Sequence, residues 1–276
     1  MFPKRFSLKD KVVVITGASS GIGLALAYEF AKRGAILVLS ARSTVLLKEI
    51  EADMRSKEYN VSHVTTDVTS SEDCKLLINK TIERHGRIDI LINNAGISMR
   101  ALFAEVEMDV IRRVMDVNFW GTAYCTRYAI ASLLESKGMI ISIISISGHI
   151  GLPARSGYSA SKFAVRGLMD AIRAENLHKG LHVLVVAPGF TTSNIRNTAL
   201  VADGSTQGES PRDEGKMMTA ERCAYLIARA AERKKNSLIL TFYEGKLAVF
   251  LNKWLPRLTT RLTFNHLAKE PNSPFK

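Results

Sequence analysis

The stretch Val12-Val-Val-Ile-Thr-Gly-Ala-Ser-Ser-Gly-Ile-Gly23 joins an apolar run to a glycine-rich turn. Four β-branched residues in succession are typical of a strand buried on both faces, and residues 24–32 continue in a helical pattern that Gly34 ends. Within the turn, Gly17 permits a tight bend, Gly21 lets the backbone approach a pyrophosphate, and Gly23 allows close packing of helix on strand. The anion would then lie at the helix N-terminus. The stretch therefore predicts a dinucleotide site.

Apolar and helical segments alternate along the rest of the chain. Strands are expected at residues 36–40, 61–65, 88–92, 139–144, 181–187 and 237–242, and helices at 44–57, 71–85, 104–137, 157–178 and 220–235. No linker, repeat or low-complexity tract interrupts residues 8–245. This alternation predicts an α/β fold in one domain, with a doubly wound parallel sheet and helices on both faces.

The composition limits the class of protein. A length of 276 residues with 46% hydrophobic residues is enough for one large core. No run approaches the roughly 18 apolar residues of a membrane span, and residues 1–11 contain no signal peptide pattern. The net charge of +12 comes without a nucleic-acid motif, so it favours an anionic ligand or an anionic membrane surface over nucleic acid.

The cysteines and histidines indicate a reducing compartment and no metal. Cys74, Cys125 and Cys223 are widely separated and odd in number, which favours reduced thiols and a cytoplasmic location. The six histidines have no metal-ligand spacing; His178 and His182 are separated by Gly180 at an expected helix end. We therefore expect no metal site.

The end of the second expected strand bears on cofactor choice. An acidic residue here would bind the ribose 2′-hydroxyl of NAD, but the strand runs into Ala41-Arg42. A guanidinium suits the 2′-phosphate of NADP, so Arg42 favours NADP(H), with NAD(H) as the alternative. The alternative interpretation of Arg42 is an ordinary solvent-facing arginine that binds no ligand.

Polar residues follow several other expected strands. Asp67-Val68 follows the third strand, where the Asp67 carboxylate could accept a hydrogen bond from an adenine amino group, and Asn93-Asn-Ala-Gly96 follows the fourth. Asn118 lies in an apolar helical stretch and, if buried, needs hydrogen-bond partners. The strand from Met139 ends near two candidate serines, Ser145 and Ser147.

Tyr158 and Lys162 are four residues apart on an expected helix and would lie on one face of it. There the ammonium could lower the pKa of the phenol from its ordinary value of about 10, so that Tyr158 could exchange a proton near neutral pH. Such pairs also occur on solvated helices without any function. The pair becomes meaningful only together with the surrounding motifs.

In this order and spacing, the motifs resemble those of the short-chain dehydrogenase/reductase family over residues 8–245. The resemblance rests on the glycine turn 16–23, Asp67-Val68, Asn93–Gly96, Asn118, Ser145, the Tyr158/Lys162 pair and Pro188-Gly189. It implies a Rossmann-like sheet and a catalytic set of Asn118, Ser145, Tyr158 and Lys162. The family spacing of thirteen residues before the tyrosine selects Ser145, with Ser147 as the alternative.

The resemblance also implies the cofactor contacts. The family often carries a basic residue in the glycine turn, where this chain has Ser20, so the NADP preference rests mainly on Arg42. In place of a common threonine after Pro-Gly, the chain offers Thr191, Thr192 and Ser193, of which Ser193 or Thr192 is expected to contact the nicotinamide amide. The full expected set is Gly17, Ser19, Ser20, Gly21, Ile22, Gly23, Arg42, Asp67, Val68, Asn94, Ala95, Gly96, Tyr158, Lys162, Pro188, Gly189, Thr191, Thr192 and Ser193.

For the family, the implied reaction is hydride transfer between a nicotinamide and a carbonyl carbon. Ser145 and Tyr158 would hydrogen-bond the carbonyl oxygen, and Tyr158 would donate the proton. Lys162 would bind the nicotinamide ribose, and Asn118 would position a water that links Lys162 to solvent. Two alternatives are a non-catalytic dinucleotide-binding scaffold and another NAD(P)-using chemistry such as epimerisation.

Two segments lie outside this common pattern. Residues 194–218 are polar and rich in glycine and proline, which favours a mobile lid. Residues 246–276 form an extension in which apolar residues recur at helical spacing, and Pro256 should divide it into two helices. This extension could pack on its own domain or a partner subunit, lie on an anionic membrane with Trp254 at the interface, or be disordered.

The substrate and the oligomer are less defined. Met99, His149, Leu152, Phe190 and Met217-Met218 are expected near the substrate, and their apolar character favours a lipophilic carbonyl or alcohol. The family resemblance implies a homodimer or homotetramer formed through the long helices at 104–137 and 157–178.

Overall fold

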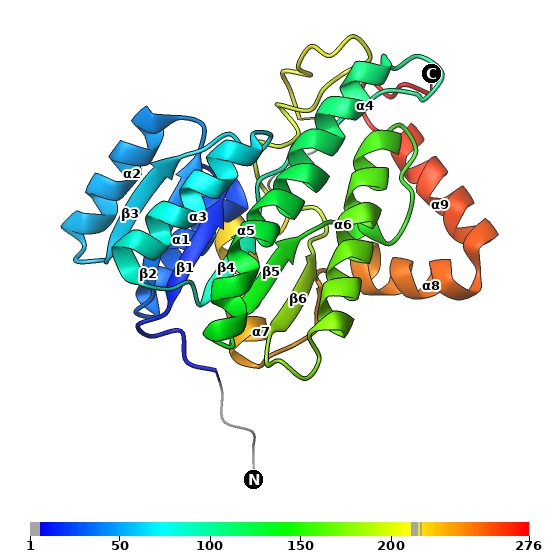
Figure 1. The fold of residues 1–276 in the computed structure, drawn as a ribbon. Coiled ribbons are helices and arrows are strands. Elements are labelled where there is room, and N and C mark those ends of the chain that lie inside the picture. Colours follow the sequence, from blue (N-terminus) through cyan, green and yellow to red (C-terminus); the bar gives the residue numbers. More distant parts are fainter. Residues whose placement is uncertain (1–5, 211–214, 216, 276) are drawn as a thin grey trace.

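The computed structural model describes residues 6–210, 215 and 217–275 (Figure 1). A parallel sheet of seven strands has the order β3-β2-β1-β4-β5-β6-β7. The strands are β1 Val12–Thr16, β2 Ile36–Ala41, β3 Val61–Thr65, β4 Ile90–Asn93, β5 Met139–Ile143, β6 His182–Ala187 and β7 Ser237–Ile239. The predicted doubly wound parallel sheet is confirmed.

Helices cover both faces of this sheet. They are α1 Gly21–Lys32, α2 Thr44–Ser56, α3 Ser71–His85, α4 Met108–Met115, α5 Gly121–Glu135, α6 Ser156–Glu175, α7 Ala220–Glu232, α8 Ala248–Trp254 and α9 Pro256–Ala268. Helix α1 packs beside α7, whereas α3 packs beside α5 and α4 beside α6. Each face of the sheet thus has its own apolar layer.

Strand β1 is covered on both faces of the sheet, and its sequence is accordingly apolar at every position from Val12 to Ile15. Val13 and Ile15 belong to one buried core, whereas Val14 belongs to the core on the opposite face of the sheet. All three side chains are fully buried. A central strand covered on both faces buries every side chain, which accounts for the continuous β-branched run.

The helical stretch predicted at 104–137 differs from a single helix. Helix α4 begins at Met108, and a π-helical turn at Asp116–Trp120 joins it to α5. The wider turn contains Asn118, whose side chain bonds to neighbouring segments, and α5 begins directly after it at Gly121, where any Cβ would crowd Val68. The π turn inside an otherwise regular helix directs the Asn118 side chain to its hydrogen-bond partners, and π turns of this kind are frequent at functional sites.

The structure also defines where the last strand ends and where the C-terminal extension divides into two helices. Strand β7 ends at Ile239 rather than at Phe242, because Thr241 adopts a positive φ of 62° and a π-helical turn at Phe242–Leu247 follows. The expected break at Pro256 is confirmed, since α8 ends at Trp254 and α9 begins at Pro256. Figure 1 shows α8 and α9 beyond α6, at the end of the molecule away from β3.

The described residues contain neither a membrane-spanning helix nor a metal-binding cluster. Within these residues, none of the helices combines the length and apolar character needed to cross a membrane. Nor do the residues described here contain a group of three or more His, Cys, Asp or Glu side chains suited to a metal ion.

Candidate active site

A cavity of about 1350 Å³ opens at the carboxyl ends of the central strands. Strands β2 and β3 extend the sheet from β1 in one direction, whereas β4 and the strands after it extend the sheet in the other direction. Such a reversal of strand order is where doubly wound sheets bind ligands. The loops after β1, β4, β5 and β6 all line this cavity.

The glycine turn and the loop after β4 are held together tightly. Gly17 and Gly21 have φ values of +65° and +52°, and a Cβ on Gly17 would come within 2.8 Å of the Ala95 Cα. The Asn94 side chain donates to the carbonyl oxygens of Thr16 and Gly17 at 3.0 and 3.1 Å. A Cβ on Gly23 would overlap the Gly17 carbonyl oxygen. These contacts shape the turn that the sequence predicts.

The N-terminus of α1 suits an anion. Ser20 occupies the N-cap position but its side chain makes no capping hydrogen bond, and the first turn contains no acidic residue. Helix N-terminal N–H groups carry partial positive charge and take up phosphates. Gly21 also faces Ser193 across the opening, because a Cβ built on Gly21 would lie 3.1 Å from the Ser193 Cβ. This cradle fits a dinucleotide pyrophosphate.

The outer end of the cavity contains the residues expected near the adenosine. Arg42, Asp67 and Val68 all line it, and Arg42 is exposed. Asp67 Oδ1 accepts hydrogen bonds from the backbone N–H and the hydroxyl of Thr69, each at 2.9 Å. Asp67 therefore also stabilises its own turn.

Asn118 supports the site from behind. It is fully buried, its Oδ1 accepts from the Ile97 N–H at 2.8 Å, and its Nδ2 donates to the Ile97 carbonyl and to Ser161 Oγ at 3.0 and 2.9 Å. A Cβ on Gly96 would lie 3.1 Å from Asn118 Oδ1 and 3.3 Å from Lys162 Nζ. The expectation that a buried Asn118 needs partners is confirmed, and they join the β4 loop to α6.

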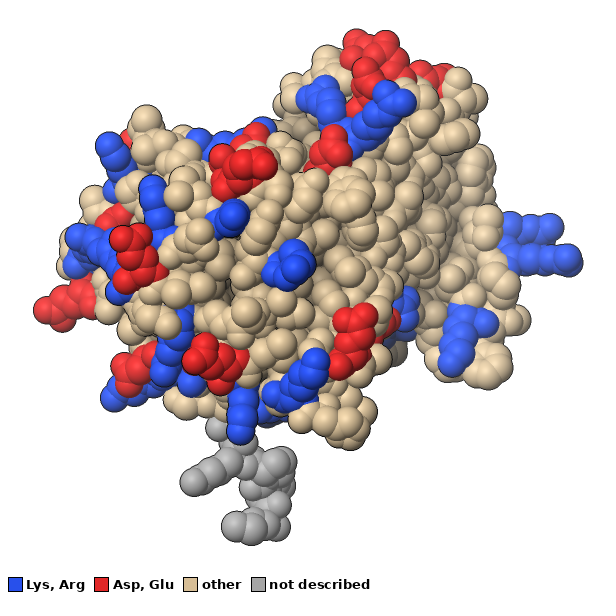
Figure 2. Space-filling view, in the orientation of Figure 1, with Lys and Arg blue, Asp and Glu red and all other residues tan. Residues whose placement is uncertain are grey.

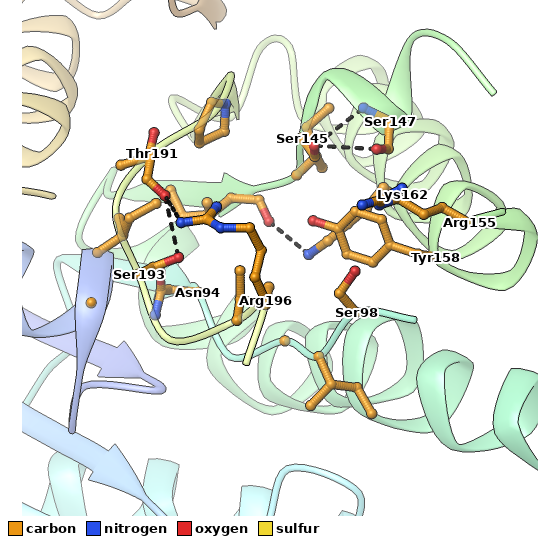
Figure 3. Close-up of a pocket in the computed structure, with 18 of the residues that line it drawn as sticks. Asn94, Ser98, Ser145, Ser147, Arg155, Tyr158, Lys162, Thr191, Ser193 and Arg196 are labelled. Atoms are coloured by element: carbon orange, nitrogen blue, oxygen red, sulfur yellow. Dashed lines mark hydrogen bonds between the residues drawn. The ribbon is translucent and has the colours of Figure 1, made fainter. Parts of the chain in front are cut away.

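Ser145 stands where β5 ends. It is the N-cap of a short 3₁₀ turn, Ile146–Gly148, and its Oγ accepts from the Ser147 N–H at 3.2 Å. Ser147 is fully buried, whereas Ser145 is partly accessible from the cavity. The two hydroxyls are 3.4 Å apart. Figure 3 shows the two serines side by side, joined by dashed lines. The exposure favours Ser145 as the serine that reaches a ligand.

Tyr158 and Lys162 lie one turn apart on the first half of α6, facing the cavity (Figure 3). Both are buried; Lys162 Nζ donates to the Ile143 carbonyl at 3.1 Å and lies 5.7 Å from the centre of the Tyr158 ring. Burial lowers the pKa of Lys162 to about 8. The amine is thus fixed between the end of β5 and the tyrosine.

The electrostatics of Tyr158 differ from the sequence-based expectation. Burial raises the pKa of the Tyr158 phenol above its ordinary value, opposed by a hydrogen bond with Ser145 and by the positive charges of Arg155 and Arg196. The lowering by Lys162 that the sequence led us to expect does not occur in this structure. Desolvation of the phenolate outweighs the nearby positive charges.

The loop after β6 closes the site. Pro188, Gly189, Thr191 and Ser193 line the cavity, but among the described lining residues Thr192 is absent. The Thr192 N–H instead donates to the Met218 carbonyl at 2.8 Å, which ties the loop to the segment before α7. Of the two residues expected to contact the nicotinamide amide, Ser193 lines the cavity and Thr192 is not among its described lining residues, and the contact itself stays a prediction.

Comparison with known proteins agrees with this geometry. Residues 11–202, more than half of the chain, match the family described as short chain dehydrogenase. The chain belongs to the short-chain dehydrogenase family. A Mus musculus relative, dehydrogenase/reductase SDR family member 7B, is 34% identical over 271 residues and covers 96% of this chain and 84% of its own.

More distant similarities are consistent with this family. An Arachis hypogaea relative, 11-beta-hydroxysteroid dehydrogenase A, is 42% identical over 210 residues, or 75% of this chain and 59% of that one. A Thermococcus sibiricus alcohol dehydrogenase solved with 5-hydroxy-NADP has 25% identity and a TM-score of 0.74, covering 84% and 96% of the two chains. A Burkholderia phymatum family member solved with NAD has 22% identity and a TM-score of 0.78, covers 98% and 99%, and shows the shared fold.

In this short-chain dehydrogenase, the π-helical turn at Phe242–Leu247 and the two C-terminal helices form a wall of the same cavity. Leu247, Leu251, Leu262 and Leu267 line it, together with Thr259, Thr263 and His266. The segment is fixed to the body of the protein where Arg100 donates to the Pro271 carbonyl at 2.9 Å and Asn252 donates to the His149 carbonyl at 3.4 Å. The extension therefore packs on its own domain.

The loop at 194–218 covers another wall of the dehydrogenase cavity. In its described part, the Leu200 N–H donates to the Ser98 carbonyl at 2.9 Å, and Arg113 donates to the Gly204 carbonyl at 3.1 Å. Residues 211–214 and 216 of the predicted lid lie outside the described residues. Mobility of this loop stays a prediction.

Several residues expected near the substrate are elsewhere. Leu152 and Phe190 line the cavity, but Met99 is fully buried beneath Gly157, where a Cβ would lie 3.0 Å from the Met99 sulfur. His149 is paired with Arg166 through its Nδ1 at 2.8 Å. Met217 and Met218 are likewise absent from the described lining residues. Hydrophobic character alone did not separate core residues from lining residues.

Sequence reasoning missed other lining residues. Arg155, Arg196 and Ser98 border the space beside Tyr158, and the residues of α9 complete it. Arg155 and Arg196 belong to no motif, so only their placement reveals them. For α9, the apolar periodicity predicted a helix without showing which surface it would cover.

Proposed function

We propose that this protein is an NADP(H)-preferring reductase that interconverts a lipophilic ketone and its secondary alcohol. The observation that carries the proposal is the position of Tyr158, Lys162 and Ser145 in one cavity with the glycine turn on one side and the apolar wall of α8 and α9 on the other. A nicotinamide cofactor would supply the hydride in this cavity. The protein would supply binding, orientation and the proton.

The cofactor would be held along the carboxyl edge of the sheet. The glycine turn and the α1 N-terminus suit the pyrophosphate, and the loop Asn94–Gly96 suits the ribose on the nicotinamide side. Lys162 would donate to the ribose hydroxyls, and Ser193 would bind the carboxamide. Gly21 approaches Ser193 closely, so the glycine turn and the loop after β6 meet at the edge of the cavity that would hold the cofactor.

The protonation state of Tyr158 suits the reductive direction. Because burial raises its pKa, the phenol keeps its proton at neutral pH and is ready to donate it. Ser145, whose side chain acts to lower the pKa of Tyr158, would share the developing negative charge on the carbonyl oxygen. Lys162 loses its own proton more readily than an exposed lysine, so it can return a proton towards Tyr158 after each turnover.

The NADP preference rests on Arg42. It lines the outer end of the cavity directly after β2, and no acidic residue occupies that strand end. Wild-type enzyme should therefore use NADPH faster than NADH, and Arg42→Asp should lower kcat/KM for NADPH by about tenfold without lowering it for NADH. Arg112→Asp, at an exposed arginine outside the cavity, is the control. Equal use of both cofactors by wild type would contradict the assignment.

The lipophilic substrate is supported by the leucines of α8 and α9 and by the Arachis hypogaea relative, which is named for a hydroxysteroid. NADPH consumption against a panel of steroid ketones, long-chain ketones and small aldehydes tests the proposal. Turnover should rise with apolar surface. A preference for small aldehydes would contradict it.

We also propose that the C-terminal helices lie on an anionic membrane surface that faces a reducing compartment, the cytoplasm. Phe250, Trp254 and Leu258 are exposed to 60%, 64% and 45%. Basic residues accompany them at Lys246, Lys253, Arg257 and Arg261. Figure 2 shows Lys and Arg side chains projecting from the side of the molecule where α8 and α9 lie. The free, buried cysteines are consistent with a reducing compartment.

A homodimer or homotetramer is the proposed assembly. Trp120 and Phe163 are exposed to 46% and 43%, on the long helical segments that were expected to mediate association. Exposed aromatic residues are enriched at protein interfaces. Light scattering should give a mass at least twice that of the chain.

A further inference from the structure

Two arginines border the reacting end of the cavity without a role in hydride or proton transfer. Arg155 directly precedes α6, and Arg196 lies in the loop that follows Ser193. Both line the cavity. Figure 3 shows them on opposite sides of the Tyr158 ring, so a substrate with its carbonyl at Tyr158 would pass between them.

Contacts within the loop fix the head group of Arg196. Its Nε donates to Ser210 Oγ at 3.1 Å, and one terminal nitrogen donates to the Thr191 carbonyl at 3.1 Å. A guanidinium has five N–H donors in a planar fork. The two contacts orient that fork at the cavity wall.

Arg155 forms an ion pair with Glu270 of the C-terminal segment. One of its terminal nitrogens lies 3.8 Å from Glu270 Oε2, and Arg100 approaches the same oxygen at 3.5 Å. The three side chains are only 5–12% exposed. Glu270 thus stands between two guanidinium groups, of which Arg155 is the one that lines the cavity.

The charge of both arginines reaches the reacting position. Each acts to lower the pKa of the Tyr158 phenol against the effect of burial. Two positively charged side chains therefore lie close enough to the Tyr158 hydroxyl to act on its ionisation. They would attract an anionic group bound a short distance from the carbonyl.

We propose that Arg155 and Arg196 bind an anionic group, a carboxylate or a phosphate, that the substrate carries close to its reacting carbonyl. The substrate would then be an anionic amphiphile whose apolar chain lies along Leu247, Leu251 and Leu262. Guanidinium groups bind both kinds of anion through paired, charge-assisted hydrogen bonds. The inference rests on the proposed function, which places the carbonyl at Tyr158.

Binding of ligands that cannot be reduced tests this inference separately from turnover. Octyl phosphate, octanoate and octanol are titrated calorimetrically into enzyme saturated with NADP⁺, so that the cofactor already covers the other anion sites. Wild type should bind at least one of the anions about tenfold more tightly than octanol, and the better anion identifies the head group. Arg155→Gln and Arg196→Gln should each weaken that anion about tenfold and leave octanol unchanged.

Three controls make the result decisive. Arg112→Gln removes the same charge from an exposed side chain outside the cavity and should leave all three affinities unchanged. Arg155→Lys should recover part of the anion affinity if charge is the cause. Circular dichroism establishes that each variant is folded, and the comparison of ligands on wild type needs no variant.

Equal affinity of wild type for octanol and both anions would overturn the inference. So would anion affinity that survives in both the Arg155→Gln and Arg196→Gln variants. Turnover of 2-octanone with NADPH is measured in parallel. Reduction of 2-octanone without anion selectivity leaves the reductase proposal intact, whereas anion selectivity without reduction of any ketone counts against the reductase proposal alone.

Discussion

At the scale of single residues, burial controls the two side chains that the chemistry depends on. It raises the pKa of Tyr158 and lowers that of Lys162 to about 8. In both cases desolvation favours the neutral form. Tyr158 is therefore neutral at pH 7, whereas Lys162 still carries its charge at pH 7 and loses it near pH 8.

The lowered pKa of Lys162 predicts a pH-dependent cost to stability. Unfolded lysine keeps its proton up to a pKa of about 10.4, whereas folded Lys162 loses its proton near pH 8, so the unfolding free energy due to this group rises between these values. Lys162→Met should increase the unfolding free energy at pH 7 by about 1–3 kcal/mol, since it removes a buried charge. The difference in unfolding free energy between Lys162→Met and wild type should decrease towards pH 10, where folded wild type no longer carries the buried charge.

Guanidinium unfolding of the cofactor-free proteins at pH 7, 8.5 and 10 measures this difference. Comparison of the two proteins cancels the titration of the other groups, such as Cys223, whose pKa burial raises to about 12. Lys162→Arg retains the charge and is the control. A constant difference between wild type and Lys162→Met across these pH values would contradict a buried, titrating amine.

At the scale of elements, the π-helical turn orients a buried side chain behind the site, and the C-terminal helices form one wall of the cavity. The π turn at Asp116–Trp120 turns Asn118 towards Ile97 and Ser161. Helices α8 and α9 place leucines inside the cavity and leave other apolar residues on the outer surface. The same short segment thus has two apolar faces with different surroundings.

The outer face of α8 should be required for membrane binding but not for turnover. Phe250 and Trp254 are exposed and do not line the cavity, so the double variant Phe250→Ser with Trp254→Ser should keep activity on a water-soluble ketone. It should lose most co-sedimentation with anionic liposomes, because an interfacial helix binds through its buried apolar area.

The matched control replaces Leu76 and Val45, which are 46% and 67% exposed on α3 and α2, by serine. That protein should pellet like wild type, and wild type should bind less at high salt, where the basic residues are screened. If the α8 variant and the control pelleted equally, the membrane proposal would be refuted.

At the scale of the whole molecule, the sequence was sufficient for the sheet and for the order of the motifs. The β-branched run at Val12–Ile15 and the glycines after it have only one compatible arrangement, because burial on both faces and a tight phosphate turn are local requirements. Strand ends lie together in any parallel sheet. For this reason, Ser145, Tyr158 and the glycine turn could be expected to line one cavity.

Other features depend on contacts between distant segments. Met99 has the same apolar character as Leu152, but close packing under Gly157 buries it. Arg155 acquires its surroundings from Glu270, more than a hundred residues later in the chain. Neither the raised pKa of Tyr158 nor the two arginines beside it could be predicted from sequence spacing alone.

The central claim is that Tyr158 donates the proton in carbonyl reduction. The most direct test is Tyr158→Phe, which removes one hydroxyl and keeps the ring, assayed for NADPH binding by fluorescence and for reduction of the best ketone from the panel. NADPH affinity should stay within about threefold of wild type, while kcat should fall by about 10²–10⁴-fold. A variant that binds NADPH and reduces the ketone at the wild-type rate would contradict the claim.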